Sequence, residues 1–235
     1  MLTVLIPCFN EEKNIINFIK NFKKKVNFQN YELIFINDYG SDNFKKLKKD
    51  FGNKKIIFIQ NKFLKGLGGT LNSGINKSKG KYVSIMMADL SDRVEDLNKY
   101  YFKIKNDNLD AVFGSRFVDG SILINYPKKK LLLNRIFNLF VKLIYFSSYN
   151  DFTNAFKIYK LTYLKKIKPF YSSHFNIFLE LPLRLINRNL NFDIISISWQ
   201  NRKDGKSNFY IRELGSRYLS TLFKCYIEKY EIKKK

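Results

Sequence analysis

The sequence is poor in the residues that form disulfides or bind zinc. Its 235 residues include two cysteines, Cys8 and Cys225, and a single histidine, His174. No CxxC pair and no cluster of cysteine and histidine occurs, which excludes a disulfide framework and a zinc site of the usual spacing. This composition fits a reducing, cytoplasmic location. We expect His174 to be a surface or packing residue rather than a catalyst.

Long apolar runs are also missing. No stretch of about 18 uncharged apolar residues occurs, so the sequence predicts no helix that spans a bilayer. The N-terminal segment MLTVLIPCFNEE turns acidic after a few apolar or small residues and has no basic leader, so it does not resemble a signal peptide.

Acidic residues are scarce relative to basic ones. The chain has 20 Asp and Glu against 43 Lys and Arg, a formal net charge of +23. Such a balance favours an anionic partner, namely nucleic acid, a phosphorylated substrate or an acidic membrane surface. The alternative is that codon bias has enriched Lys on solvated faces, because Asn, Ile, Phe and Tyr, which share AT-rich codons with Lys, are abundant as well. Composition does not choose between these explanations.

What the first 115 residues contain is an alternation of strand and helix patterns. Apolar residues recur at helical spacing between the strands, for example Ile15, Ile19 and Phe22. Short, almost continuously apolar strands separated by helices are typical of a parallel sheet covered on both faces. We therefore predict an open α/β sheet whose strands lie at 2–6, 32–37, 55–60, 82–88 and 110–115.

The pattern becomes less regular after residue 115. Residues 131–146 are strongly apolar but carry Asn134, Arg135, Asn138 and Lys142 along one stripe, after the lysines at 128–130. This amphipathic segment is either a helix lying in a membrane interface or a half-buried core helix. The remaining predictions are a strand at 155–159, a helix at 179–189, a strand at 191–199, a polar loop at 201–208 and a final helix at 211–230.

Acidic residues follow three of the predicted strands. Glu11 comes after the first strand, Asp38 after the second, and Asp89 and Asp92 after the fourth. Parallel sheets of this kind bind ligands beyond the carboxyl ends of their strands, where the strand order reverses. We expect these carboxylates to meet there and to hold a cation or polar ligand groups. For Asp92 there is an equal alternative, because Asp92 and Glu95 form the D-x-x-E pattern of a capping box before a helix.

The glycines at 66, 68 and 69 do not form a known phosphate-binding motif. A G-x-G-x-x-G motif would need glycine in place of Leu71 and would follow the first strand. No G-x-x-x-x-G-K-[ST] sequence is present either. The sequence therefore argues against a dinucleotide-binding loop of the Rossmann type and against a P-loop.

Six segments, taken in order, resemble the family 2 glycosyltransferases of the GT-A fold, most closely the dolichol-phosphate mannosyltransferase-like branch. Each segment alone is weak, but their order along nearly the whole chain is specific. The segments are IPCFNEEKNI (6–15), FINDYGSDN (35–43), GLGGTLNSGINKSKGKYVSIMMADLSD (66–92), GSRFVDG (114–120), DFTNAFKIY (151–159) and NRKDGKSNF (201–209).

The resemblance implies a role for particular side chains. The nucleotide of a nucleotide-sugar donor would contact Pro7, Phe9, Glu11, Asn37, Asp38 and Ala88. The donor diphosphate would be held through Mg²⁺ or Mn²⁺ by Asp89, which matches the last acid of the family's D-x-D motif, with Asp92 beside it. Catalytic residues would be Asp89, Arg116 and Arg202. Acceptor-side candidates are Lys157, Glu180 and Ser207.

Several positions depart from the family pattern. Met87 stands in place of the first D-x-D acid, which removes a possible metal ligand. We expect Asp89, with Asp92 or a water, to hold the metal, since Mg²⁺ needs one or two protein carboxylates when phosphates and waters complete its shell. The alternative is an inactive, degenerate site. Asn37 replaces the first acid of the nucleotide turn but still forms hydrogen bonds. Ala155 and Asn208 stand where the family often has glycine and lysine.

The expected activity is metal-dependent, inverting transfer of a sugar from a nucleotide-sugar donor. The expected acceptor is a polyprenyl phosphate, whose oxygen is anionic near neutral pH and needs no general base. A saccharide hydroxyl, which needs a base such as Glu180, is the alternative acceptor, and a catalytically inactive nucleotide-binding homologue is a further one. A nucleic-acid-binding protein would explain the charge but not the acids at three strand ends.

We expect a single domain over residues 1–235. Its nucleotide-sugar-binding half would be 1–115 and its acceptor-side half 116–210, followed by a C-terminal helix and basic tail at 211–235. A cytoplasmic protein that rests peripherally on an anionic membrane face would combine the basic charge with the amphipathic segment at 131–146.

Overall fold

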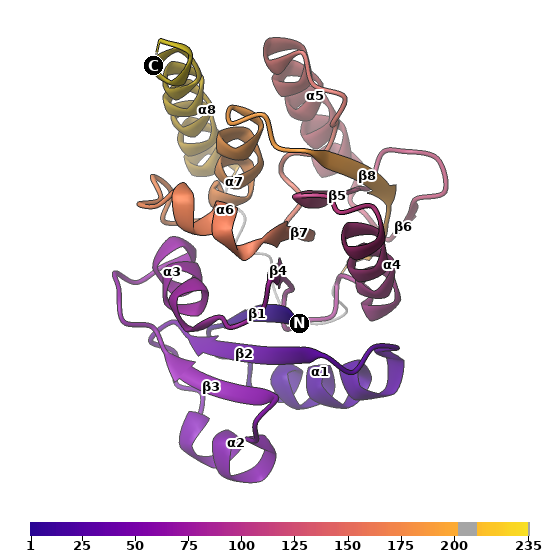
Figure 1. Cartoon of the computed structure of the whole chain (residues 1–235), viewed down its shortest axis with the longest axis vertical. Helices are drawn as coiled ribbons and strands as arrows, with labels where there is room; N and C mark the ends of the chain where they lie inside the picture. The colour runs from indigo at the N-terminus through magenta and orange to yellow at the C-terminus, as the bar shows by residue number, and fades with distance from the viewer. Residues whose placement is uncertain (202–210, 235) are drawn as a thin grey trace.

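A seven-stranded sheet forms the centre of the computed structural model, which describes residues 1–201 and 211–234 (Figure 1). The strand order is β3-β2-β1-β4-β7-β5-β8, and β7 alone among these strands runs antiparallel to its two neighbours. The predicted α/β class with a mostly parallel sheet is confirmed. The strands are β1 (Leu2–Cys8), β2 (Tyr31–Asn37), β3 (Ile56–Gln60), β4 (Tyr82–Ile85), β5 (Ala111–Ser115), β7 (Lys157–Lys160) and β8 (Phe192–Ser196).

Helices cover both faces of this sheet, because successive side chains of its strands point to opposite sides. Val4 packs into the core under α1 and α4, whereas the next residue, Leu5, packs into the core on the other face. Both side chains are completely buried. The helices are α1 (Glu12–Lys25), α2 (Phe44–Phe51), α3 (Leu67–Lys77), α4 (Val94–Asn106), α5 (Lys128–Tyr145), α6 (Leu161–Lys166), α7 (Ile177–Ile186) and α8 (Ile211–Lys233).

Four details differ from the sequence-based expectation. The single strand expected at 191–199 is two strands, β8 and β9 (Ser198–Gln200), because β9 leaves the main sheet and pairs with a short strand, β6 (Ile122–Ile124). Neither β6 nor α6 was predicted. The helix expected from residue 131 begins at Lys128. The capping box at Asp92 is wrong, since α4 has Arg93 at its N-cap and no capping hydrogen bond from that side chain.

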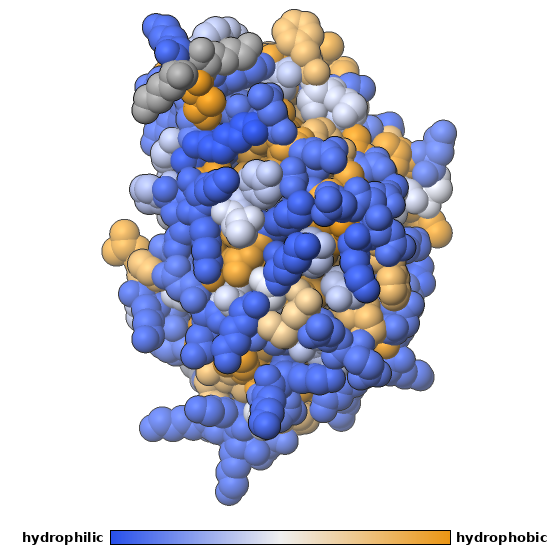
Figure 2. Space-filling view, in the orientation of Figure 1, coloured by the Kyte–Doolittle hydropathy of each residue, from blue (hydrophilic) through white to orange (hydrophobic). Residues whose placement is uncertain are grey.

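Helices α5 and α8 together expose a large apolar surface. They contact each other through their aromatic rings, with ring centroids 5.7 Å apart for Phe137 and Tyr218 and 6.3 Å apart for Tyr145 and Tyr226. Figure 2 shows hydrophilic side chains over most of the face in view and apolar ones grouped at the upper end, near the top of α5. The exposed residues, here called the α5–α8 apolar face, are Leu132, Leu133, Ile136, Leu139, Phe140, Leu143, Phe146, Leu219, Phe223, Ile227 and Tyr230.

Within residues 1–201 and 211–234, no helix combines the length and the apolar character needed to cross a membrane. Charged residues interrupt both amphipathic helices, as Arg135 and Lys142 do in α5. The apolar face is therefore a surface of two amphipathic helices.

Candidate active site

A cavity of about 820 Å³ opens where the strand order reverses, between the carboxyl ends of β1 and β4. The chain runs outward from β1 through β2 to β3 and then returns to the other side of β1 with β4. Reversal points of this kind leave a crevice that the flanking loops line. Of the residues predicted from sequence, Pro7, Phe9, Glu11, Asp38, Asp92 and Arg116 all line this cavity.

The loops after β1 and β2 are tied together by backbone contacts. The Asp38 N–H donates to the Cys8 carbonyl at 2.9 Å, and the Glu11 N–H donates to the Asp42 carboxylate at 2.7 Å. Asn10 and Tyr39 lie in the left-handed region, with φ of 58° and 59°. Non-glycine residues rarely adopt this conformation, and where they do so the surrounding contacts hold them. These loops therefore form a fixed rim rather than loose connections.

Asp38 is held in place by the loop before α3. Its two carboxylate oxygens accept from the Gly66 N–H at 3.0 and 2.9 Å, and one of them also accepts from the Asn61 side chain at 2.9 Å. Gly66 has φ of +122°, and a Cβ there would lie 2.5 Å from the Ser173 carbonyl oxygen. Glycine is thus required at this position, and it fixes the carboxylate that the sequence assigned to the nucleotide.

Two of the predicted nucleotide contacts lie close by but do not line the cavity. The Asn37 side chain is buried and closes its own turn, accepting from the Gly40 N–H at 2.7 Å and donating to the Gly40 carbonyl at 3.2 Å. Ala88 is buried in the loop after β4, which ends at Ile85 rather than at the predicted residue 88. Asn37 therefore shapes the loop that carries Asp38, and a direct nucleotide contact from either residue stays a prediction.

Phe9 offers a flat, accessible ring at the rim of the cavity. It is 46% exposed, and the Lys65 ammonium lies 4.7 Å from its ring centroid. An aromatic face with a cation beside it suits a stacked base and an anionic group. Lys65 was not predicted, although it directly precedes the first of the quoted glycines.

Asp92 lines the cavity, whereas Asp89, the predicted metal ligand, lies near Asp92 but does not itself line the cavity. Asp92 is 3% exposed, and its Oδ1 has no hydrogen-bond partner among the described residues. Burial, followed by the nearby negative charge of Asp89, raises the pKa of Asp92 to about 7. Asp89 in turn accepts from the Ser91 N–H at 3.0 Å. A divalent cation fits here, because it would supply the positive charge and the partner that the buried oxygen lacks.

A complete protein cage for a metal is not present in the described parts of the chain. No group of three or more His, Cys, Asp or Glu side chains within residues 1–201 and 211–234 could hold an ion. Met87 lines the cavity at the position of the first D-x-D acid. Asp89 and Asp92 stay the predicted donors, and a pair of carboxylates suits a hard cation whose other ligands are phosphate oxygens and waters.

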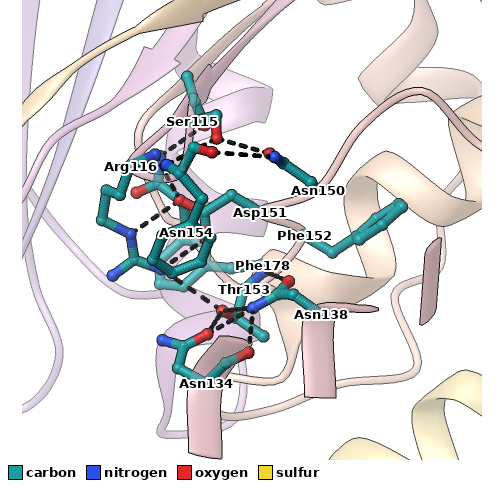
Figure 3. A network of polar contacts seen from close by, with 12 residues as sticks. Ser115, Arg116, Asn134, Asn138, Asn150, Asp151, Phe152, Thr153, Asn154 and Phe178 are labelled. Atoms are coloured by element: carbon teal, nitrogen blue, oxygen red, sulfur yellow. Dashed lines mark hydrogen bonds and ion pairs between the residues drawn. The ribbon is translucent and has the colours of Figure 1, made fainter. Parts of the chain in front are cut away.

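Arg116 is the most firmly fixed cation of the cavity (Figure 3). Its Nε and Nη2 donate to the two carboxylate oxygens of Asp151 at 2.8 and 2.7 Å, and its backbone N–H donates to the same carboxylate at 2.8 Å. Asp151 is completely buried. Although burial alone opposes the charge, the Asp151 carboxylate raises the pKa of Arg116 above its ordinary value, so the guanidinium stays charged.

The remaining edge of Arg116 faces a polar wall. Its Nη1 lies 3.5 Å from the Tyr126 hydroxyl and its Nη2 lies 3.5 Å from Thr153 Oγ1. Asn134 connects these groups, donating to Tyr126 at 2.9 Å and accepting from Thr153 at 2.8 Å. Tyr126, Asn134 and Thr153 all line the cavity. They therefore place neutral hydrogen-bonding groups next to the fixed positive charge.

Lys157 and Glu180, predicted on the acceptor side, are both buried away from the cavity wall. Lys157 is 1% exposed, its ammonium donates to the carbonyls of Phe152 and Asn154, and burial lowers its pKa to about 7. Glu180 accepts from two backbone N–H groups, those of Tyr171 and Ser172, and pairs with Arg184 at 3.0 Å. Arg202 and Ser207 lie outside the described residues.

Some cavity residues were missed from the sequence. Asp151 lies in the quoted segment DFTNAFKIY, but nothing in the spacing of that segment indicated that it would bind Arg116. Tyr126, Asn134, Trp199 and Tyr218 come from four different elements or loops, and only the three-dimensional fold brings them together.

Comparison with known proteins identifies the class. The family model described as "Glycosyl transferase family 2" matches residues 3–168, more than half of the chain. The chain therefore belongs to glycosyl transferase family 2, as its sequence segments indicated. Membership of this family makes the chain a glycosyltransferase.

Two curated relatives indicate where in the family it lies. The chain is 28% identical over 184 residues to a dolichyl-phosphate beta-glucosyltransferase of Dictyostelium discoideum, with 72% of this chain and 56% of that protein covered. It is 27% identical over 135 residues to a dolichol-phosphate mannosyltransferase of Pyrococcus furiosus, with 57% of this chain and 38% of that protein covered. The chain thus spans less than two thirds of either relative, and these matches support the dolichol-phosphate mannosyltransferase-like branch.

The fold matches that of a solved GT-A enzyme. Glucosyl-3-phosphoglycerate synthase from Mycobacterium tuberculosis, in complex with Mn²⁺, UDP-glucose and phosphoglyceric acid, superposes with a TM-score of 0.72 at 14% identity. The match covers 96% of this chain and 79% of that one. At this identity the similarity establishes the GT-A fold, as predicted.

Proposed function

We propose that this glycosyltransferase moves a sugar from a nucleotide-sugar donor to a polyprenyl phosphate at a membrane surface. The observation that carries the proposal is the division of the cavity into two parts of different chemistry. One part is polar and charged, with Glu11, Asp38, Lys65, Asp92 and Arg116. The other part is apolar and lies between α5, α8 and the start of α7, with Leu133, Phe137, Phe175, Phe178, Tyr218 and Leu219.

Each part suits one substrate. Asp38 and Phe9 can receive a ribose hydroxyl and a base, and the cations can receive a diphosphate. The apolar part suits an isoprenoid chain, because each buried CH₂ contributes about 0.8 kcal/mol. The two relatives, a dolichyl-phosphate beta-glucosyltransferase and a dolichol-phosphate mannosyltransferase, support the same acceptor class.

The chemistry rests on offsetting negative charge. When the acceptor oxygen attacks the anomeric carbon from the opposite face, charge grows on the departing diphosphate oxygen. Arg116, held by Asp151, is a pre-oriented cation for that oxygen, and such fixed groups need no rearrangement as the charge develops. A phosphate acceptor is already anionic near neutral pH. Glu180, the candidate base for a hydroxyl acceptor, does not line the cavity, which favours the phosphate.

Asp89 and Asp92 would hold Mg²⁺ or Mn²⁺. The bound ion would supply positive charge to the diphosphate. The solved complex of the mycobacterial enzyme with Mn²⁺ and UDP-glucose supports both the metal and the nucleotide-sugar class. The unpartnered Oδ1 of Asp92 supports the same assignment from this chain's own residues.

The α5–α8 apolar face would rest on the membrane and present the cavity to the lipid. Leu133 and Leu219 belong both to this face and to the cavity lining, so the apolar surface continues into the cavity. Basic residues border it, including the lysines at 128–130 and Lys224 and Lys229. Each basic residue near an anionic surface adds about 1 kcal/mol to membrane binding.

Membrane binding is tested by flotation with vesicles that contain phosphatidylglycerol. We expect Phe140→Glu/Phe223→Glu to lower the bound fraction at least tenfold, because two exposed rings of the apolar face become charged. The matched control is Phe102→Glu, on α4, which is 39% exposed and lies outside the face. Equal binding of the double variant and the control would contradict a membrane role for α5 and α8.

The acceptor class is tested by turnover. Purified protein should transfer sugar from a nucleotide-sugar panel to a short polyprenyl phosphate, with the product separated by thin-layer chromatography. Turnover of a saccharide hydroxyl but not of the polyprenyl phosphate would select the alternative transferase. Nucleotide binding without turnover of either would indicate an inactive homologue.

A further inference from the structure

A second, smaller cavity lies beside the first, between α8 and the loop at 171–176. Its volume is about 420 Å³, many times the roughly 30 Å³ that one water molecule takes up in the liquid. His174 lines both cavities, which places the second next to the first. We call it the α8 pocket and define it by Ser173, Asn176, Ser216, Arg217, Thr221 and Lys224, which are part of its lining. None of these six residues lines the main cavity.

The lining of the α8 pocket is cationic and rich in hydroxyl groups. Arg217 and Lys224 are seven residues apart on α8 and therefore lie on one helix face, with Ser220 and Thr221 between them. None of the described lining residues is acidic. The buried acid behind the loop, Glu180, already accepts from the N–H groups of Tyr171 and Ser172 and pairs with Arg184. This combination selects for an anion that brings several acceptor oxygens.

The inner wall of the pocket is a buried hydrogen-bond network in which one acceptor oxygen has no partner among the described residues. The Asn176 amide donates to Ser172 Oγ at 2.9 Å and to Thr221 Oγ1 at 2.8 Å, and these three side chains are all buried. Asn176 Oδ1 has no partner among the described residues. Asn176 is 6% exposed, and a buried carbonyl oxygen of this kind gains from a hydroxyl donor. A ligand that carries hydroxyl groups as well as negative charge would provide one.

The loop that forms this wall is held from behind. The Gly68 N–H donates to the Ser173 carbonyl at 3.1 Å, and a Cβ at Gly68 would collide with the Ser172 carbonyl. The Tyr171 and Ser172 N–H groups bind Glu180. A wall that is already ordered loses little conformational entropy when it binds a ligand.

We infer that the α8 pocket is a binding site for the phosphate ester of a small polyol, of which glycerol phosphate is the simplest example. Arg217 and Lys224 would hold the phosphate, and the hydroxyl groups and Asn176 would hold the polyol. The same chemistry is offered by two sources, a free polyol phosphate and the head group of phosphatidylglycerol. The inference does not require the proposed acceptor or transfer reaction, because binding is measured on the protein alone.

The test is calorimetric titration of the full chain with glycerol 3-phosphate, without nucleotide or metal. We expect saturable binding that Arg217→Gln/Lys224→Gln weakens at least tenfold. The matched control is Lys48→Gln/Lys49→Gln on α2, which removes the same charge from exposed positions far along the chain and should change the affinity less than twofold. Far-ultraviolet circular dichroism and urea unfolding establish that both double variants are folded.

A second arm separates the two sources. Flotation with phosphatidylglycerol vesicles and with phosphatidylcholine vesicles is compared for the same two double variants. A further control, Lys128→Gln/Lys129→Gln, removes the same charge from exposed lysines at the border of the α5–α8 apolar face. Weak titration with the free ester, together with a loss of phosphatidylglycerol binding that is larger in Arg217→Gln/Lys224→Gln than in this control, would assign the pocket to the lipid head group. The inference is overturned if neither arm distinguishes the two double variants. Binding in the main cavity would give that result, since Arg217 and Lys224 do not line it.

Discussion

Replacing Asp151 tests whether the fixed position of Arg116 matters for activity. Asp151→Asn keeps the shape of the side chain but removes the negative charge that pairs with Arg116, whose side chain is 7% exposed. Removing one partner of a buried ion pair costs about 3 to 5 kcal/mol, because the remaining charge is left uncompensated. The asparagine keeps one acceptor oxygen, so we expect a loss near the lower end, about 3 kcal/mol of unfolding free energy.

The transfer rate should fall as well. Without the two-oxygen contact, Arg116 is no longer held toward the cavity, and loss of one pre-oriented stabilising group lowers kcat by about a hundredfold. Urea unfolding gives the stability, and single-turnover transfer gives the rate. The matched control is Asp193→Asn, which breaks the 2.7 Å surface pair with Lys103 and should change stability by less than about 1 kcal/mol. If Asp151→Asn behaves like this control in both assays, Arg116 is not a positioned catalytic group.

Two further predictions concern Lys157 and Gly66. The pKa of Lys157 is about 7 in the folded protein and about 10.4 in the unfolded chain. Between pH 7 and about pH 10.4 the unfolded state therefore binds more protons than the folded state, so the free energy of unfolding rises with pH in this range. Lys157→Met should remove about 2 kcal/mol of that rise between pH 7.5 and 9 in urea unfolding, and an unchanged slope would show that the ammonium stays charged against its carbonyl partners. Gly66→Ala should destabilise the protein by about 1 to 3 kcal/mol, because it strains the backbone against Ser173, and should weaken nucleoside diphosphate binding through Asp38. The control is Gly215→Ala in α8, because a Cβ added at Gly215 meets nothing within 4 Å, and this variant should be as stable as wild type or slightly more stable. If Gly66→Ala and Gly215→Ala lose a similar amount of unfolding free energy, the steric argument is contradicted.

Most of the parallel half of the fold could be predicted from residue periodicity. Apolar strands of five to seven residues and helices with apolar residues three or four apart are local patterns, and they predicted β1, β2, β3, β5 and the helices between them. The position of β7 was not predictable in this way. It lies between β4 and β5 and pairs Tyr82 with Lys160, residues far apart in sequence. Periodicity identifies a strand but does not give its neighbours.

The same limit applies to short elements. The break between β8 and β9 falls at Ile197, which is buried and lies between Ser196 and Ser198, so the alternation of apolar and polar residues continues through the break. The three residues of β6 and the six of α6 are too few to show a period. At Asp92 a local motif predicted a helix cap, whereas the tertiary structure buries this residue beside Asp89.

In the site, the residues at strand ends were predictable and those positioned by tertiary packing were not. Pro7, Glu11, Asp38 and Asp92 line the cavity because parallel strands end at one edge. Lys157 and Glu180 match family positions but point into the protein, where carbonyls or an arginine bind them. Their burial depends on how α7 and β7 pack, which the sequence pattern does not give.

The most direct test of the central claim is metal-dependent transfer by the wild-type protein and by Asp89→Asn. Wild-type protein is incubated with a panel of nucleotide sugars, a short polyprenyl phosphate and Mg²⁺ or Mn²⁺, and the formation of glycosyl phospholipid is measured. We predict transfer from at least one donor, abolished by chelation and reduced at least a hundredfold in Asp89→Asn, whose folding is verified by circular dichroism. Transfer that is equal in the variant, or that is unaffected by chelation, would contradict the account.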